Sequence, residues 1–193
     1  MVPDSLSAKD TWDVIRLDDG DRVVRAVHLP DARAEECDLV LVTSDAQLLR
    51  FPASAVRPQG RAAGGMAGIR LADGAQVIAF AAVVPASAVV VTVAGTTQAL
   101  PGTDSGNVKV TPLAEYPAKG RGTAGVRAHR LRSGQDALLA AWVGPAPARA
   151  ATASGVPVDL PESDLRRDGS GVALTIPVAG IGSGLSSALD GPA

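Results

Sequence analysis

Arginines and glycines recur at matching positions of two stretches of this chain, residues 51–74 and residues 110–134. Gly60 and Arg61 in the first stretch correspond to Gly120 and Arg121 in the second. Guanidinium and ammonium groups neutralise phosphates, and glycines let the backbone approach a phosphate and offer it N–H groups. Such contacts position DNA without reading its bases. The spacing therefore predicts a basic rim that binds duplex DNA independently of its sequence.

The candidate DNA contacts are the cations on or near these glycine-rich stretches. They are Arg57, Arg61, Arg70, Lys119, Arg121, Arg127, Arg130 and Arg132. Recurrence favours a DNA contact for Arg61 and Arg121. Arg70 and Arg130 fall within expected strands, where pairing inside the protein is the competing interpretation. The glycines of the same stretches have two interpretations as well, phosphate approach or a tight turn between repeats. These glycines are Gly60, Gly65, Gly120 and Gly125.

Charge is unevenly distributed along the chain, although its net value is only −2. Residues 1–48 carry 11 acids and 5 bases, a local charge of −6. Residues 50–71 carry four arginines and no acid, and residues 109–132 carry six cations against Glu115. Clustering, rather than the total, marks a surface that binds DNA. A single cluster could be an ordinary solvated face, but two clusters at matching repeat positions favour a binding surface.

The composition is typical of a folded protein with a core of small side chains. Of the 193 residues, 46% are apolar and 3% aromatic, which excludes general disorder. The most apolar stretch, residues 77–94, is interrupted by Pro85 and Ser87, so no membrane helix is expected. The polar N-terminus is not typical of a signal peptide. A single cysteine, Cys37, excludes a disulfide within the chain and fits a reducing cytoplasm.

No combination of residue types supports catalysis, a metal or a cofactor. His28 and His129 sit in strand-like runs, and no second cluster of ligands completes a metal site. The glycine series is not followed by a helix, which excludes a nucleotide-binding loop. We expect Tyr116, Trp12 and Trp142 to be structural. The sequence therefore predicts a module that is not an enzyme on its own.

Runs of β-branched residues between turn signals predict an all-β fold with very little helix. The expected strands cover residues 22–29, 38–43, 47–51, 67–71, 76–84, 88–93, 108–111, 126–131, 137–143, 149–153, 155–160 and 172–178. A hairpin turn is expected at residues 94–96. A flexible leader at 1–12 and a flexible tail at 182–193 are expected on either side of one domain at 13–181.

The expected strands group into repeat units of about 17–70, 71–130 and 131–181. Each unit opens with a Leu-x-x-Gly turn, at residues 17–20, 71–74 and 131–134. Units of this length with about four strands are typical of propeller blades. The third unit is altered, as expected where an array stops. In it Arg166 and Arg167 lie between Asp164 and Asp168, which offset their charge and predict local salt bridges.

Two segments of the second unit resemble a known family. They are Thr-Pro-Leu-Ala-Glu-Tyr at residues 111–116 and Gly-Arg-Gly-Thr-Ala-Gly-Val at residues 120–126. Together they resemble the blade signature of the C-terminal DNA-wrapping domain of bacterial type IIA topoisomerase A subunits, which are those of DNA gyrase and topoisomerase IV. The resemblance covers about residues 14–180. It implies a β-pinwheel, a propeller-like array of four-stranded antiparallel blades that exchange strands, here with about three to four blades.

The resemblance also implies a function and partners. It implies a non-catalytic module that bends duplex DNA around its basic rim and so assists supercoiling or decatenation by the holoenzyme. The implied partners are double-stranded DNA, the N-terminal cleavage domain of the same polypeptide and the ATPase subunit, with no membrane. The implied location is the bacterial cytoplasm, in association with the nucleoid.

Two features depart from the family pattern. The gyrase-specific box reads Gln-Arg-Arg-Gly-Gly-Lys-Gly, whereas residues 59–65 keep only the glutamine, one arginine and some glycines. Family domains also have more blades than the three units counted here, which indicates a fragment or an unusually short domain. Gyrase and topoisomerase IV stay open as alternatives. A propeller-like protein-interaction scaffold without DNA binding is the competing function.

Overall fold

The computed structural model describes residues 15–29, 31–60, 63–100 and 103–183. Its strands are β1 (Asp38–Thr43), β2 (Gln47–Pro52), β3 (Val77–Val83), β4 (Ala88–Gly95), β5 (Asn107–Pro112), β6 (Val126–Arg127), β7 (Ala137–Pro145), β8 (Ala148–Ala151), β9 (Pro157–Val158), β10 (Val172–Ala173) and β11 (Gly180–Ser183). Helix among these residues is limited to α1 (Asp31–Ala34) and the short 3-10 helices η1 (Ala53–Ala55), η2 (Pro85–Ser87) and η3 (Leu113–Glu115). The predicted all-β fold is confirmed. The expected leader, with Trp12, lies outside the described residues.

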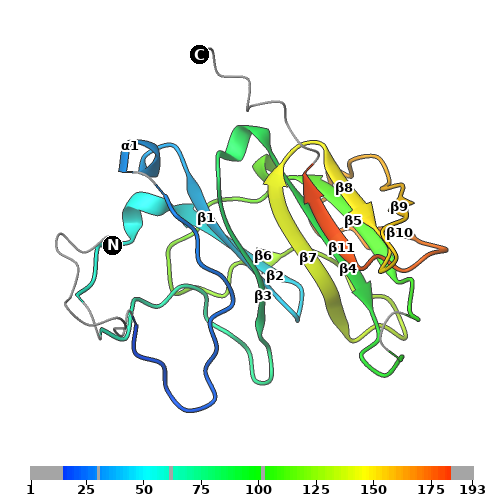
Figure 1. Cartoon of the computed structure of the whole chain (residues 1–193), viewed down its shortest axis with the longest axis horizontal. Helices are drawn as coiled ribbons and strands as arrows, with labels where there is room; N and C mark the ends of the chain where they lie inside the picture. Colours follow the sequence, from blue (N-terminus) through cyan, green and yellow to red (C-terminus); the bar gives the residue numbers. More distant parts are fainter. Residues whose placement is uncertain (1–14, 30, 61–62, 101–102, 184–193) are drawn as a thin grey trace.

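The strands form three antiparallel sheets that lie next to one another as blades (Figure 1). Blade A has the strand order β3-β1-β2-β6, blade B the order β7-β4-β5-β10, and blade C the order β11-β8-β9. The two central strands of blades A and B, and the strands β8 and β9 of blade C, are hairpins formed by neighbouring strands in the sequence. The flanking strands come from later in the chain.

Sequence repeats and blades are out of phase, because the second and the third repeat each contribute strands to two blades. The second repeat, residues 71–130, gives β3 and β6 to blade A but the hairpin β4–β5 to blade B. The third repeat gives β7 and β10 to blade B and the hairpin β8–β9 to blade C. Each of these repeats thus holds its own hairpin and two flanking strands of the preceding blade. This strand exchange confirms the predicted pinwheel.

The offset between the sequence repeats is also a structural offset. The same offset that relates Gly60 to Gly120 also relates β2 to β5 and η1 to η3. Both pairs of elements begin and end at equivalent residues. The three Leu-x-x-Gly turns are closed by the same backbone hydrogen bond, from Asp21 N to Asp18 O, from Ala75 N to Ala72 O and from Gln135 N to Arg132 O, each 3.0 Å long. Their glycines share a positive φ, +85° at Gly20, +75° at Gly74 and +85° at Gly134. The repeat is therefore a repeat of backbone geometry as well as of sequence.

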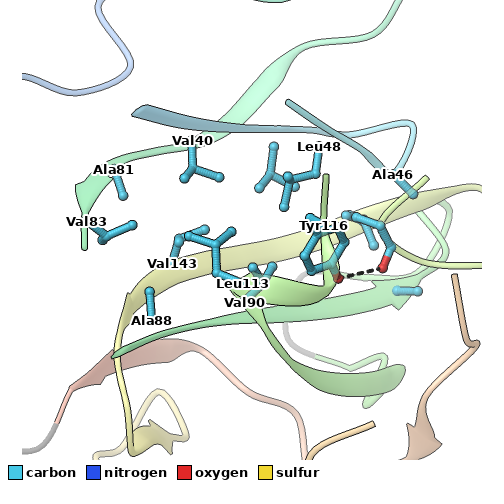
Figure 2. Packing of buried hydrophobic residues seen from close by; sticks show 14 residues of the cluster. Val40, Ala46, Leu48, Ala81, Val83, Ala88, Val90, Leu113, Tyr116 and Val143 are labelled. Atoms are coloured by element: carbon cyan, nitrogen blue, oxygen red, sulfur yellow. Dashed lines mark hydrogen bonds between the residues drawn. The ribbon is translucent and has the colours of Figure 1, made fainter. Parts of the chain in front are cut away.

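The core lies between the blades and is filled by alternate residues of the strands. β4 is buried along its whole length because it has a blade on each side. Val90 of β4 packs towards blade A, whereas Val89 and Val91 pack towards blade C, as the two-residue period of a strand requires. Figure 2 shows Val40 of blade A facing Val143 of blade B across this core. Small and β-branched side chains thus build the core that the scarcity of aromatic residues implied.

Several expected strands are absent or shorter than predicted. Residues 22–29 and 67–71 form no strand, and the strand expected at 126–131 is limited to β6. The expected strands at 155–160 and 172–178 are reduced to β9 and β10. A strand is stable only beside a partner, so β-branched residues without one stay irregular.

Two expected breaks are also misplaced. The hairpin turn expected at 94–96 is wrong, because β4 continues to Gly95 and pairs there with β7. Gly182 and Ser183, expected in the flexible tail, belong to β11 and pair with β8.

Candidate nucleic-acid interface

The glycine-rich loops of successive repeats are joined to one another by backbone hydrogen bonds. Arg70 N donates to Thr123 O at 2.9 Å, and Arg130 N donates to Gly169 O at 3.0 Å. Both bonds start from equivalent positions, because Arg70 and Arg130 are related by the offset of the repeats. The bonds align three segments in one series, which we call the loop strip. It consists of residues 63–70, 119–130 and 164–171.

Glycine is required where a loop crosses the hairpin of the preceding blade. Gly125 has a φ of +76°, and a Cβ atom there would overlap the carbonyl oxygen of Leu48. Gly171 has a φ of +64°, and a Cβ atom there would overlap the carbonyl oxygen of Val108. The structural interpretation is therefore confirmed for Gly125. At Gly60, Gly65 and Gly120 a Cβ would meet no atom within 4 Å.

Most of the predicted DNA contacts lie on or beside the loop strip and are exposed. The exposed ones are Arg57, Arg70, Lys119, Arg127, Arg130 and Arg132. Arg121 is half-buried. Arg61, which recurs with Arg121 in the sequence, lies outside the described residues. Of the predicted contacts, Arg57 precedes the strip and Arg132 follows its second segment.

Two of these arginines bridge one loop to the next, which the sequence did not reveal. The guanidinium group of Arg121 donates to Ala67 O at 2.8 Å, and that of Arg132 donates to Gly171 O at 2.8 Å. A guanidinium group has five N–H donors, so one such bond leaves donors for a phosphate. The bridges hold the cations in place along the strip.

Two ion pairs bring acids to the third segment of the strip. Arg130 lies 3.3 Å from Asp168, with 63% and 47% of the two side chains exposed. Pairs this exposed contribute little to stability and can exchange for a phosphate. Arg166 pairs with Asp164 at 3.5 Å, as expected. The pairing expected for Asp168 within its own loop is wrong, because its partner is Arg130.

Lys109 belongs to the second basic cluster in the sequence but is not on the surface. The residue is 1% exposed, and its ammonium group donates to the carbonyl oxygens of Arg166 and Arg167. Burial lowers the pKa of Lys109 to about 8, against the opposing effect of nearby aspartates. The equivalent residue one repeat earlier is Leu49, an ordinary core residue. Lys109 thus fastens the third segment of the strip to blade B and is no DNA contact.

Arg50 is the corresponding exception in the first basic cluster. Its guanidinium group lies 3.0 Å from Asp38 in a pair whose side chains are 14% and 13% exposed. Its Nε also donates to Tyr116 O at 2.6 Å. Arg50 therefore joins the hairpin of blade A to the turn at the end of η3.

His129 belongs to the second segment of the strip, but its side chain is buried, although two exposed arginines lie close to it in the sequence. Its Nδ1 is 2.9 Å from Thr92 Oγ1, and burial lowers its pKa to about 4. The neutral ring cannot serve as a cation for DNA at neutral pH. His129 follows β6 and His28 is exposed outside any strand, so the strand-like surroundings expected for both are wrong.

Tyr116 is fully buried, and its hydroxyl donates to Ala128 O at 3.3 Å (Figure 2). Desolvation raises the pKa of this phenol. Trp142 is partly buried and packs against the core between blades B and C. The structural role expected for both residues is confirmed.

The loop strip offers guanidinium, ammonium and backbone N–H donors, which are the groups that bind phosphates. Within the described part of the chain, no three His, Cys, Asp or Glu residues are grouped so that they could hold a metal ion. No described helix is long and apolar enough to cross a membrane.

Comparison with known proteins points to one family, because the matching family model and the curated relatives agree. Residues 38–84 and 102–141 match the family described as DNA gyrase C-terminal domain, beta-propeller. The chain is 40% identical over 122 residues to the topoisomerase subunit TopoM of Mycolicibacterium smegmatis and 33% identical over 127 residues to the A subunit of DNA gyrase from Pseudomonas aeruginosa. These alignments cover 63% and 66% of this chain but 15% and 12% of the relatives. The chain therefore spans only a small part of their length.

Solved structures share the fold. The C-terminal domain of DNA topoisomerase IV superposes with a TM-score of 0.67 at 23% identity, over 87% of this chain and 51% of that one. The E. coli ParC C-terminal domain superposes with a TM-score of 0.57 at 15% identity, over 77% of this chain and 60% of that one. This chain therefore spans only part of each of these solved domains.

Proposed function

We propose, since this chain belongs to the family of the DNA gyrase C-terminal domain, that it is a non-catalytic module that binds and bends duplex DNA along the loop strip. The observation that carries this proposal is the alignment of the glycine-rich loops by the bonds from Arg70 to Thr123 and from Arg130 to Gly169. These bonds place exposed cations of successive repeats in one series. A surface of this kind contacts phosphates and does not read bases.

The arrangement of the cations suits a bent duplex. Bending a short site costs about 1–6 kcal/mol, which must be offset by several phosphate contacts. The exposed cations Arg70, Lys119, Arg127 and Arg130 come from two successive repeats, so one duplex could contact several of them at once. Such a set of phosphate contacts is what would offset the cost of bending.

The relatives suggest the setting in which such bending acts. They include TopoM, a topoisomerase subunit, together with the A subunit of a DNA gyrase. We place this module in the A subunit of a type IIA topoisomerase, where it would present a second DNA segment to the N-terminal cleavage domain with the help of the ATPase subunit. Supercoiling or decatenation would be the outcome for that holoenzyme, in the bacterial cytoplasm at the nucleoid.

The test is the salt dependence of DNA binding. A fluorescent duplex of about 40 base pairs is titrated with the wild-type chain and with Lys119→Ala/Arg127→Ala over a salt series. Both residues are exposed, and each lost phosphate contact lowers the slope of log K against log salt by about 0.9, so the double variant should lose about 2. The matched control is Arg149→Ala, an exposed arginine on β8 of blade C that is not one of the strip residues. It should leave the slope unchanged.

Two results would contradict the proposal. The first is absence of binding by the wild type at low salt, which would favour the protein-interaction scaffold. The second is an equal slope for the double variant and the control, which would move the DNA to another surface. Energy transfer between dyes at the two duplex ends then separates bending from binding, because a bound but straight duplex gives no increase.

A further inference from the structure

The third segment of the loop strip can be aligned with the second by its backbone geometry. Gly125 and Gly171 have a positive φ, and each lies against a hairpin carbonyl that a Cβ atom would overlap. The strands β6 and β10 begin directly after these glycines and pair with β2 and β5. Residues 118–125 of the second segment therefore correspond to residues 164–171 of the third.

The hydrogen bonds between the loops keep the same register. Arg70 N donates to Thr123 O, and Arg130 N donates to Gly169 O. Both acceptors lie two residues before the glycine that crosses the hairpin in their segment. The surroundings of Arg70 can thus be compared directly with those of Arg130.

Acidic side chains distinguish the third segment from the second. Asp164 and Asp168 stand where the second segment has Ala118 and Gly122. Neither alanine nor glycine has a side chain that can compete with a phosphate for an arginine, whereas a carboxylate can. The two aspartates are therefore a local change in the chemistry of the strip.

The recurring arginine is kept in the third segment, although the positive charge is not. Arg167 corresponds to Arg121, and both side chains are half-buried. Residues 118–125 carry two cations and no acid, whereas residues 164–171 carry two arginines and two aspartates. The third segment thus has a net charge of zero where the second has a charge of +2.

Asp168 is the acid that reaches the neighbouring loop. Its Oδ2 lies 3.3 Å from Nη2 of Arg130, which belongs to the second segment. In the described part of the chain, Arg70 has no carboxylate within ion-pair distance. The position that corresponds to Asp168 beside Arg70 is Gly122. Two equivalent arginines therefore differ in whether a carboxylate occupies them.

Asp164 has a different task from Asp168. Its Oδ1 accepts a hydrogen bond from Arg166 N at 2.9 Å, and its own N–H donates to Val110 O at 2.8 Å. Asp164 therefore shapes its own loop. The only side-chain ion pair of Asp168 within the described residues is the one with Arg130.

The backbone that carries Asp168 is held in place. Lys109 donates to the carbonyl oxygens of Arg166 and Arg167, which directly precede Asp168. This anchoring keeps the carboxylate close to Arg130, so little additional order is needed to form the ion pair.

We propose that Asp168 is an internal competitor of DNA phosphate, which occupies Arg130 and weakens the hold of the strip on DNA at its third segment. The inference rests on the proposed function, because it concerns the same DNA-binding surface. A phosphate that approaches Arg130 must displace the carboxylate and meets its negative charge. The duplex is then held by the first two segments, and Asp168 sets the point at which it leaves the strip.

The test repeats the salt series on the full chain with Asp168→Asn, using the same duplex of about 40 base pairs. Asparagine keeps the shape of the side chain and removes its charge. The matched control is Asp159→Asn, at an exposed aspartate that follows β9 and is not one of the strip residues. It changes the net charge by the same amount.

Asp168→Asn should bind the duplex on the order of fivefold more tightly at low salt, because an exposed ion pair no longer has to be broken. The slope of log K against log salt should become steeper by about 0.9, the value of one added phosphate contact. Asp159→Asn should leave the slope unchanged. In an Arg130→Ala background, Asp168→Asn should no longer steepen the slope, since the cation that it releases is absent.

The outcomes separate this inference from the proposed function. Equal binding by Asp168→Asn and Asp159→Asn would overturn the inference and leave the DNA-binding module standing. An equal gain with and without Arg130 would also overturn it, because Asp168 would then act only by general repulsion. If neither the wild type nor Asp168→Asn binds at low salt, both proposals fail. Binding by Asp168→Asn alone would support both.

Discussion

Replacing Lys109 by leucine tests the claim that a charged side chain fastens the third segment of the loop strip to the core. Leucine stands at the equivalent position of the preceding repeat, where Leu49 is fully buried. Lys109→Leu removes the donor to the carbonyl oxygens of Arg166 and Arg167 and also removes the buried charge. These two effects oppose each other at pH 7, so the pH dependence of stability is the sharper observable.

The sign follows from the proton balance. Burial lowers the pKa of Lys109 from 10.5 to about 8 in the folded protein. Between these values the unfolded chain binds more protons than the folded one, so the free energy of unfolding rises with pH in this window. The difference between the two pKa values corresponds to at most about 3.4 kcal/mol, and solvent screening reduces this to about 1–3 kcal/mol. The variant lacks this rise.

The assay is urea unfolding of both proteins at intervals between pH 7 and pH 10. The wild type should gain about 1–3 kcal/mol relative to Lys109→Leu, which is a midpoint shift of roughly 0.5–1.5 M for a protein of this size. The raised pKa of Tyr116 acts with the opposite sign above pH 10. It is present in both proteins and cancels in the difference. Parallel curves for the two proteins across the whole range would refute the reasoning, because Lys109 would then be solvated.

Two further predictions concern a glycine and a histidine. Gly125→Ala should lower the free energy of unfolding by about 2–4 kcal/mol, because a Cβ overlaps the Leu48 carbonyl and strains the backbone. Gly134→Ala, with a φ of +85° and open space, should cost only about 1–2 kcal/mol, and equal losses in thermal or urea unfolding would contradict the crossing geometry. Burial lowers the pKa of His129 from 6.5 to about 4, so the unfolded chain binds more protons between these values and stability falls as the pH falls through them. His129→Asn should lose this part of the acid sensitivity in urea midpoints between pH 7 and pH 4.5, and an unchanged pH profile would show that the ring is solvated.

Local sequence determined much of the fold. The strand expected at residues 38–43 matches β1 without a shift, and the hairpins β1–β2 and β4–β5 lie where β-branched runs flank turn signals. The equivalent bounds of η1 and η3 in successive repeats follow directly from the repeat itself. Such features depend on alternation and on turn chemistry, which neighbouring residues specify.

The candidate site was predicted less completely. Exposure is confirmed for Lys119 and Arg127, which lie in glycine-rich surroundings in the sequence. Lys109 and Arg50 belong to the same clusters of positive charge but are largely buried, and nothing in their local sequence separates them from exposed cations. For Lys109 the repeat itself was an available signal. Its equivalent one repeat earlier is Leu49, an apolar residue typical of a core position.

The sequence by itself determined the repeat, the all-β character and the positive charge of the glycine-rich loops. Only the tertiary structure decided to which blade each strand belongs, because a flanking strand pairs with a hairpin that lies well before it in the chain. It also decided which segments become strands at all. Val126 and Arg127 form β6 because β2 lies beside them, whereas residues 22–29 are rich in β-branched side chains but have no described partner. Propensity is local, whereas the hydrogen bonds and burial that stabilise a strand come from residues distant in the sequence.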